Sequence, residues 1–271
     1  MGAHGVEVVA GDLGDASSLR AAFAEVDAAF AVTTPFEEGT QAEVEQGRAI
    51  VAAAAQAELP HLVLASVASA NRSTGVPHFE SKERIEEILA QEDLAWTVIA
   101  PPYFFDNLLG GLQSIREGWL QLPLPPDRPL QQLARQDLGA LVTAVVADRE
   151  RHVGRRIEAA SDAPTPAQMA AALQKVLHRP VEPVQVPLAM VHESSADMRA
   201  MWDLINREAT TWTSAHCTAP IRTSPGRPSP PGRRATRQSA HMDLSCEQSA
   251  SMPVPATVPR TDGDGTRVRL A

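Results

Sequence analysis

The chain contains almost no tyrosine and almost no lysine, and these two shortages exclude one arrangement of catalytic residues. Among 271 residues, Tyr103 is the single tyrosine, and Lys82 and Lys175 are the only lysines beside 22 arginines. Side chains four residues apart share one face of a helix, so a lysine at that spacing can lower the pKa of a tyrosine. The residue four after Tyr103 is Asn107. A catalytic tyrosine–lysine pair of this spacing is therefore excluded.

Cysteine and long apolar runs are also scarce. The two cysteines, Cys217 and Cys246, cannot make a disulfide framework. The longest apolar candidate, Ala49–Ala55, falls far short of the roughly 18 residues that cross a bilayer. No basic segment followed by an apolar stretch marks a secretory signal. We therefore expect a cytoplasmic protein without a membrane segment.

Charge is unevenly distributed along the chain. Residues 1–208 hold 16 basic and 29 acidic side chains, a net charge of −13, whereas residues 209–271 hold 8 basic and 4 acidic ones, a net charge of +4. An acidic body repels phosphates, so no nucleic-acid binding by the folded part is expected. The eight histidines show no metal-ligand spacing with carboxylates or cysteines, and no serine lies in a G-x-S-x-G turn. We therefore predict neither a metal site nor a hydrolase.

Short apolar runs alternate with helical stretches over the first 160 residues, which is typical of a parallel α/β sheet. The predicted strands cover residues 6–10, 28–33, 61–66 and 95–100. The predicted helices cover residues 16–26, with Asp15 as N-cap, and residues 38–58, and a third contains residues 81–91.

The second part of the chain is more irregular. Its predicted elements are a helix over residues 138–147 capped by Asp137, strands over 155–159 and 181–186, and a helix over 188–205. Thr165 and Gln168 form a capping box with Pro166 at the first helical position, which predicts a helix as far as Leu177. Residues 209–271 are rich in Pro, Ser, Thr and Arg without periodicity, which predicts disorder.

Four segments together resemble the NmrA-like branch of the atypical short-chain dehydrogenases. They are GVEVVAGDLGD at residues 5–15, VTTPFEEGT at 32–40, HLVLASVASA at 61–70 with HFESK at 78–82, and APPYFFDNLL at 100–109. The resemblance covers residues 5–207. It implies a partial, Rossmann-like NAD(P)-binding domain over residues 1–107 and a smaller α+β substrate region over residues 108–207, before a disordered tail over residues 208–271.

The resemblance also implies which residues contact NADP or NAD. They are Asp12, Leu13, Thr33, Thr34, Pro35, Ser66, Lys82, Pro101, Phe104 and Asn107. Asp12 would accept a hydrogen bond from the adenine amino group, and the small hydroxyls at residues 33–34 suit the ribose and phosphate linkage. A turn before a helix explains Asp12 equally well, and a turn at the end of a strand explains residues 33–35.

Three residues are candidates for catalysis. Lys82 takes the place of the superfamily's lysine, but His78 stands four residues before it where a tyrosine is usual. The resemblance implies that Lys82 contacts the cofactor ribose; the alternative is a surface lysine beside Glu86. His78 can donate a proton near neutral pH. Ser66 ends a predicted strand at the depth of the superfamily's catalytic serine.

The glycine-rich turn that opens a complete dinucleotide-binding domain has no counterpart in the expected place. Gly11 and Gly14 are followed by Ser17 at the third position and come after the wrong strand. The interpretation is a sheet that lacks its first two strands, with an impaired grip on the pyrophosphate and no means to distinguish NAD from NADP. Strand 6–10 would then pair with strand 28–33 or fray, and strand 28–33 would become an edge.

The segment after Arg207 departs from the pattern of the family. Residues 208–226 admit codons that, read in another frame from Glu208, encode a sequence similar to the C-terminus of NmrA-like proteins. We therefore hypothesise a frameshift near Glu208, which the coding DNA sequence would test.

The resemblance leads to three hypotheses of function. The first is hydride transfer between NAD(P)H and a small carbonyl or quinone substrate. The second is a non-catalytic regulator that senses the redox state of NAD(P) and binds a protein partner, which the missing tyrosine favours. The third is an inactive fragment. Turnover of NAD(P)H distinguishes the first from the other two.

Overall fold

The structure is a computed structural model that describes residues 8–192, 195–208, 219–220 and 268–270. All of them belong to one compact unit, which comprises residues 1–222 and 267–271. No helix in these described stretches is both long enough and apolar enough to cross a membrane.

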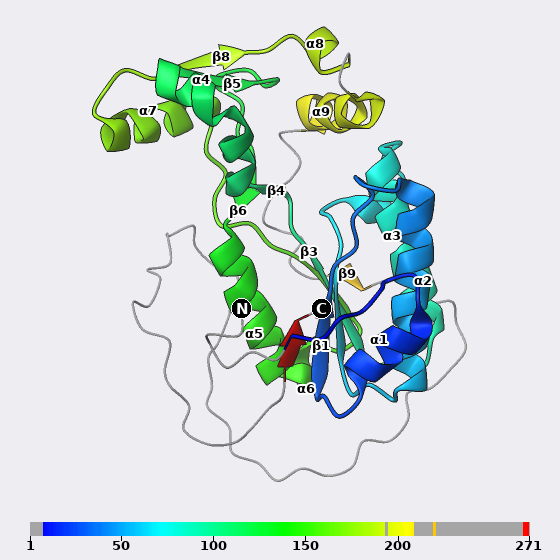
Figure 1. Cartoon of the computed structure of the whole chain (residues 1–271). Helices are drawn as coiled ribbons and strands as arrows, with labels where there is room; N and C mark the ends of the chain where they lie inside the picture. Colours follow the sequence, from blue (N-terminus) through cyan, green and yellow to red (C-terminus); the bar gives the residue numbers. More distant parts are fainter. Residues whose placement is uncertain (1–7, 193–194, 209–218, 221–267, 271) are drawn as a thin grey trace, which may run out of the picture. The chain divides into compact units, whose positions relative to one another are not determined.

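A mainly parallel sheet lies at the centre of this unit (Figure 1). Its order is β10-β1-β2-β3-β7-β9, formed by Val268–Leu270, Ala28–Ala31, Leu62–Ala65, Trp96–Ala100, Arg155–Glu158 and Ala219–Pro220. Neighbouring strands are parallel except β9, which pairs antiparallel with β7. The predicted parallel α/β architecture is confirmed.

Helices cover both faces of the sheet (Figure 1). On one face lie α1 (Ala16–Phe23), α2 (Thr40–Gln56) and α3 (Pro77–Gln91), and on the other lies α5 (Arg135–Ala147). Successive side chains of a strand point to opposite faces. Leu62 and Leu64 of β2 accordingly pack in the core with α1–α3, while Val63 packs against Val142 and Val145 of α5.

A second apolar core lies among elements from the later part of the chain. Its elements are α4 (Leu112–Glu117), β5 (Trp119–Leu122), α7 (Pro166–Leu177), β8 (Glu182–Gln185), α8 (Leu188–His192) and α9 (Ala196–Glu208). β5 and β8 pair in parallel, and the predicted capping box of Thr165 and Gln168 begins α7. Val76 and Phe79, at the start of α3, belong to this second core. The start of α3 is therefore fixed by the second core, and its remainder by the first.

Several short elements were not predicted. Among them are η2 (Ala70–Arg72), β4 (Tyr103–Phe104), η3 (Phe105–Gly111), β6 (Gln132–Leu133) and α6 (Arg149–His152). β4 and β6 form a two-stranded parallel pair. Each of these strands has only two residues, too few to show an alternating pattern in the sequence.

Several predicted elements are corrected by the structure. Of the predicted strand 6–10, the described residues 8–10 lie in no strand, and Val8 is 70% exposed. β10 pairs with β1 instead, so β1 as an edge is wrong. The described residues 8–10 do not pair with β1, which agrees with the alternative that this segment frays. The predicted helix 188–205 is two helices, α8 and α9. Asp137 lies within the first turn of α5 rather than at its N-cap, which is Ala134.

The predicted disorder of residues 208–271 falls mostly outside the described residues. Within that range, Glu208 ends α9, and Ala219–Pro220 and Val268–Leu270 form strands of the central sheet, so the prediction is wrong for these six residues. β10 pairs in parallel register with β1, with Val268 opposite Ala28. Pairing with a strand so distant in sequence leaves no local periodicity to detect.

Gly47 lets α2 approach α3 closely. A Cβ at this position would lie 2.5–2.7 Å from three carbon atoms of Ile85, which is 1% exposed. We expect Gly47→Ala to lower the free energy of unfolding by about 1–3 kcal/mol, because the packed core has no room for a methyl group. Gly139, inside the exposed side of α5, has no atom within 4 Å of its Cβ position, so Gly139→Ala should stabilise by about 0.5–1 kcal/mol. Urea denaturation that gave both variants the same sign would contradict this.

His61 lies buried at the amino end of β2 and is 1% exposed. The Thr97 hydroxyl donates to the carbonyl of His152 at 2.8 Å and therefore accepts from Nε2–H of His61 at 2.9 Å. Nδ1 of His61 then carries no proton and has no partner among the described residues. Burial, with a smaller contribution from Arg149 and His152, lowers the pKa of His61 from 6.5 to about 4.

This histidine should make the fold sensitive to acid. The unfolded imidazole binds a proton near pH 6.5 and the folded one only near pH 4, so stability is complete above pH 6.5 and falls between these values by about 3 kcal/mol. We expect His61→Gln to flatten this part of the stability–pH curve measured by urea denaturation. His178→Gln, at an exposed residue, serves as the control and should keep the wild-type slope. An unchanged slope in His61→Gln would refute the assignment.

Candidate functional site

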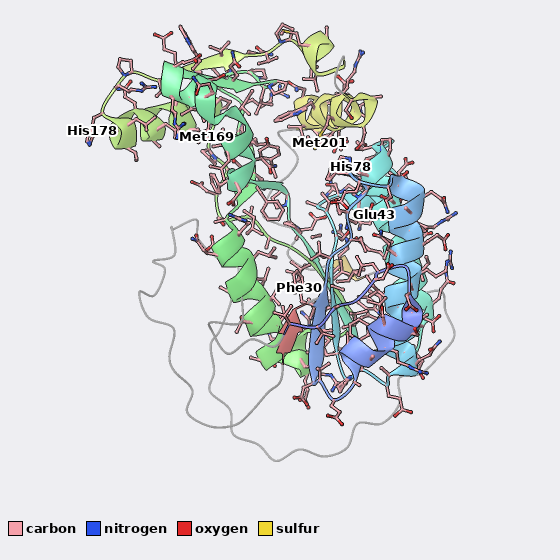
Figure 2. All side chains as sticks on the ribbon, in the orientation of Figure 1. Phe30, Glu43, His78, Met169, His178 and Met201 are labelled. Carbon is pink, nitrogen blue, oxygen red and sulfur yellow. The ribbon has the colours of Figure 1, made fainter. Side chains whose placement is uncertain are left out.

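Lys82 is held at the carboxyl end of β1. Its Nζ donates to the carbonyl oxygen of Thr33 at 2.7 Å and to the Thr33 hydroxyl at 2.9 Å, and lies 2.9 Å from Oε1 of Glu43. The Thr33 hydroxyl donates in turn to Glu43 at 3.1 Å, and the Ser81 hydroxyl donates to the other Glu43 oxygen. Figure 2 shows Glu43 on α2 and His78 on α3 at the same end of these helices.

The charges of this cluster are buried together. The Lys82 side chain is 11% exposed and that of Glu43 is fully buried. Burial lowers the pKa of Lys82, and the carboxylate of Glu43 opposes this effect. An ammonium has three donors, and all three have acceptors here. Lys82 is therefore not a surface lysine, although the nearby charge of Glu86 also acts on its pKa. The contact of Lys82 with a ribose stays a prediction.

Ser66 belongs to a second buried network at the ends of β2 and β7. Its hydroxyl donates to Glu86, whose other oxygen pairs with Nε of Arg156 at 2.9 Å. Arg156 also pairs with Glu158 and donates to the carbonyl oxygen of Val67 at 2.8 Å. Because the Ser66 hydrogen is committed to Glu86, the geometry gives this serine a structural role. Its catalytic role stays a prediction.

His78 contacts an acidic residue that the sequence analysis did not single out. Its Nδ1 lies 2.8 Å from Oδ1 of Asp197, in the first turn of α9, and its backbone N–H donates to the same oxygen at 3.2 Å. The ring lies edge-on to Phe79, with centroids 4.7 Å apart, and 5.9 Å from the ring of Phe36. His78 thus contacts both Phe36, in the turn that follows β1, and Asp197 of α9.

Asp12 is a turn residue, as the alternative interpretation expected. Its Oδ1 accepts from the amide of Gly14 at 2.8 Å, and its carbonyl accepts from the amide of Asp15 at 3.0 Å. Asp15 caps α1 as predicted, with its carboxylate on the amide of Ser17. No hydrogen bond or ion pair joins Asp12 to the Lys82 or Ser66 clusters within the described stretches.

The remaining predicted cofactor residues lie in three segments: before α1, after β1 and after β3. Leu13 packs against the first core, Thr34 is exposed, and Pro35 accepts from the amide of Gly39 at 2.8 Å. Pro101 is buried, and its carbonyl accepts from the amide of Ala68 at 2.9 Å. Phe104 is partly buried in β4, and Asn107 is exposed and hydrogen-bonded to Tyr103, whose pKa is raised by burial.

These residues fit some parts of a dinucleotide better than others. The exposed hydroxyl of Thr34 and amide of Asn107 can hydrogen-bond to ribose or nicotinamide, and the second carboxylate oxygen of Asp12 can accept from adenine. The N-terminus of α1 does not suit a pyrophosphate, because the Asp15 carboxylate already accepts from the amide of Ser17 in its first turn and the Asp12 carboxylate accepts from the amide of Gly14 just before it. The Ser17 hydroxyl and amide lower the pKa of Asp15, so this end of α1 carries negative charge.

Four charged residues of these networks were missed by sequence analysis, and a fifth, Glu86, was considered only as a surface neighbour of Lys82. The four are Glu43, Arg156, Glu158 and Asp197. Glu43 shares a buried face of α2 with Gly47, Ile50 and Ala54, at helical spacing, so an acidic residue within an apolar stripe was the available signal. Asp197 carries no such signal, because its partner is 119 residues away.

The chain is similar to proteins of one family. A profile of the NmrA-like family matches residues 1–213. NAD(P)H azoreductase of Xenophilus azovorans is 27% identical over 199 residues, which are 73% of this chain and 68% of that protein.

The solved structures that share the fold include those of a reductase and of a transcriptional regulator. The structure of triphenylmethane reductase of Citrobacter sp., complexed with NADP(H), has a TM-score of 0.64 at 22% identity and covers 79% of this chain and 78% of its own. The structure of NmrA, a negative transcriptional regulator, in complex with NAD has a TM-score of 0.59 at 22% identity, with coverage of 74% and 66%.

Proposed function

The chain belongs to the NmrA-like family, and from this membership we propose that it binds NAD(P)H and reduces a small conjugated carbonyl or quinone substrate. The observation that carries the proposal is the arrangement at the carboxyl end of β1, where Lys82 holds Thr33 and His78 lies one helical turn before Lys82. In parallel α/β sheets, nucleotides bind outside the carboxyl ends of the strands. The azoreductase and the triphenylmethane reductase, both named with NAD(P)H or NADP(H), support a reductase over other activities.

Different side chains near the carboxyl ends of the strands would contact different parts of the nucleotide. NAD(P)H, when bound, supplies a hydride. Lys82 fixes the carbonyl and hydroxyl of Thr33, and so orients the turn through Thr34 and Pro35 that would meet the ribose. Asn107 would hydrogen-bond to the nicotinamide side and Asp12 to the adenine. Among the candidates for polarising a substrate carbonyl, His78 is favoured over Ser66, because the hydroxyl hydrogen of Ser66 is committed to Glu86.

We further propose that this chain grips the pyrophosphate weakly. The sequence has no glycine-rich turn in the expected place. Before and within the first turn of α1, the carboxylates of Asp12 and Asp15 already accept from the amides of Gly14 and Ser17, and their negative charge opposes a phosphate. The affinity for NAD(P)H would then come mainly from contacts with its adenosine and its nicotinamide riboside. The dissociation constants of NADH and NADPH, measured by fluorescence titration with the full chain, test this. Binding at the submicromolar level would contradict a weak grip.

The test of the proposed function is turnover. The full chain should oxidise NADH or NADPH when 1,4-naphthoquinone is added, with the loss of nicotinamide absorbance as the readout. Lys175→Met, at an exposed lysine of α7, is the control and should keep the wild-type rate. A folded chain that binds neither cofactor would overturn the proposal.

A second candidate function is a regulator that binds the nucleotide without turnover. The absence of a tyrosine–lysine pair and the likeness of the fold to NmrA support it. Binding of NAD or NADP without oxidation of any acceptor would favour this candidate.

A further inference from the structure

His78 and Asp197 meet from two elements that are far apart in sequence. His78 is the second residue of α3, and Asp197 is the second residue of α9. One carboxylate oxygen of Asp197 accepts from both Nδ1 and the backbone N–H of His78, at 2.8 and 3.2 Å. The two side chains are 11% and 24% exposed, so water screens their interaction only in part. Two donors on one oxygen fix the carboxylate relative to the ring.

The contact determines which ring nitrogen of His78 is available. A carboxylate only accepts hydrogen bonds, so Nδ1 must carry a hydrogen. Nε2 has no hydrogen-bond partner among the described residues. It is also absent from the set of fully buried side-chain atoms without a partner, so it is not sealed from solvent. When the ring is protonated, Nε2–H is therefore the hydrogen left for a ligand.

Asp197 faces His78 more directly than any other charged group. On α3 itself, Lys82 is committed to Glu43, and Glu80 accepts from the amide of Gly75. The turn that carries Phe36 continues into Glu37 and Glu38, which are exposed. The Phe79 and Phe36 rings pack on the imidazole. The carboxylate of Asp197 is therefore the acidic group in direct contact with the His78 ring.

We propose that His78 is the proton donor of the reaction and that Asp197 is its positioning residue. This inference rests on the proposed reductase function and adds the source of the proton. The substrate carbon gains the hydride that NAD(P)H supplies, and the π electrons of the C=O bond move to the oxygen. His78 transfers the Nε2 proton to this oxygen, and water then returns a proton to the ring. The pair thus takes the part of the tyrosine that the chain lacks.

Asp197 also has an alternative, purely structural role. It satisfies one free amide at the start of α3, whose N-cap residue Val76 offers no side-chain hydrogen bond. Asp197→Asn keeps an oxygen acceptor for that amide but removes the charge. A structural role alone would affect every substrate equally, whereas proton donation matters only where an oxygen must be protonated.

Two hydride acceptors distinguish these roles. A quinone needs a hydride and a proton, while a triarylmethyl dye cation such as crystal violet needs only a hydride at its central carbon. We expect His78→Gln to lower kcat for 1,4-naphthoquinone on the order of 100-fold or more, and Asp197→Asn to lower it about tenfold. Both variants should reduce the dye within about twofold of the wild-type rate, which also shows that they fold. Asp203→Asn, at a partly exposed residue of α9 paired with Arg199, should leave both rates unchanged.

Each outcome of the experiment has one meaning. Equal losses for quinone and dye, or no loss for quinone, overturn the proton-donor assignment and leave the reductase function standing. A wild-type chain that reduces neither acceptor overturns the reductase function instead. A second measurement needs no turnover: the ¹⁵N shifts of the neutral His78 ring should show hydrogen on Nδ1. Hydrogen on Nε2 would refute the pairing with Asp197 by itself.

Discussion

Replacing Arg156 with methionine is expected to lower the free energy of unfolding by about 3–5 kcal/mol, because it leaves a buried carboxylate without its partner. Arg156 is 2% exposed and Glu86 is 3% exposed. The guanidinium pairs with Glu86 and Glu158 and donates to the carbonyl of Val67. Methionine fills a similar volume, so the loss would report the charge rather than a cavity. Guanidinium chloride denaturation of the full chain measures it.

Two companion variants separate this effect from a general sensitivity to arginine loss. In the double variant Arg156→Met/Glu86→Leu both buried charges are absent, and most of the lost stability should return. Arg84 pairs with Glu87 on the exposed side of α3, with side-chain exposures of 66% and 53%. Arg84→Met should therefore change the stability by less than about 1 kcal/mol. A single Arg156→Met variant as stable as the wild type would show that the network contributes nothing.

The same network shapes the loop beside the site. Glu158 accepts from the backbone amide of Ser69, a residue with a positive φ of 65°. A non-glycine residue in this region costs free energy, which a hydrogen bond from a fixed carboxylate can offset. Ser66, Val67 and Ser69 are all tied to one buried group of charges. Ser66 is thereby better placed to hold the end of β2 than to act on a substrate.

Patterns in the sequence predicted the strands and helices that depend mainly on residues close together in the chain. Strands β1, β2, β3 and β7 lie within the predicted runs, and α7 begins at the predicted Thr165 cap. The pairing of β10 with β1 was missed, because it joins residues about 240 apart, and no periodicity in either segment records the other. The break between α8 and α9 was missed because Val191 and Met198 are seven residues apart and so match helical spacing. The available signal was Ser195, whose hydroxyl accepts from the amide of Met198 at the start of α9.

The site was predicted in part for the same reason. The motif placed Lys82 and His78 one turn apart on one helix, and the structure confirms that both lie on α3. What the sequence could not supply was their partners: Glu43 from α2 and Asp197 from α9. A buried cation needs a buried anion, but the sequence does not state which of 33 acidic residues provides it.

Replacing Lys82 with methionine should also lower the free energy of unfolding by about 3–5 kcal/mol. Glu43 is fully buried, and its other partners, Ser81 and Thr33, are neutral hydroxyls that do not balance its charge. In the double variant Lys82→Met/Glu43→Gln, the amide keeps an oxygen for the hydroxyls and removes the orphaned charge. Most of the stability should therefore return, as thermal and urea denaturation would measure. Equal stability of the single and double variants would contradict the pairing.

The double variant also separates the two ways in which Lys82 can serve a nucleotide. If Nζ leaves Thr33 and contacts the ribose directly, the folded double variant should bind NADPH at least about tenfold more weakly, since a charged hydrogen bond is worth about 1.5–3 kcal/mol. If Lys82 acts only by holding the Thr33 carbonyl, the dissociation constant should change by less than about threefold, because Glu43→Gln can still hold the Thr33 hydroxyl. All three donors of the ammonium are already used, which favours the smaller change. Lys82 is then a residue that shapes the turn after β1.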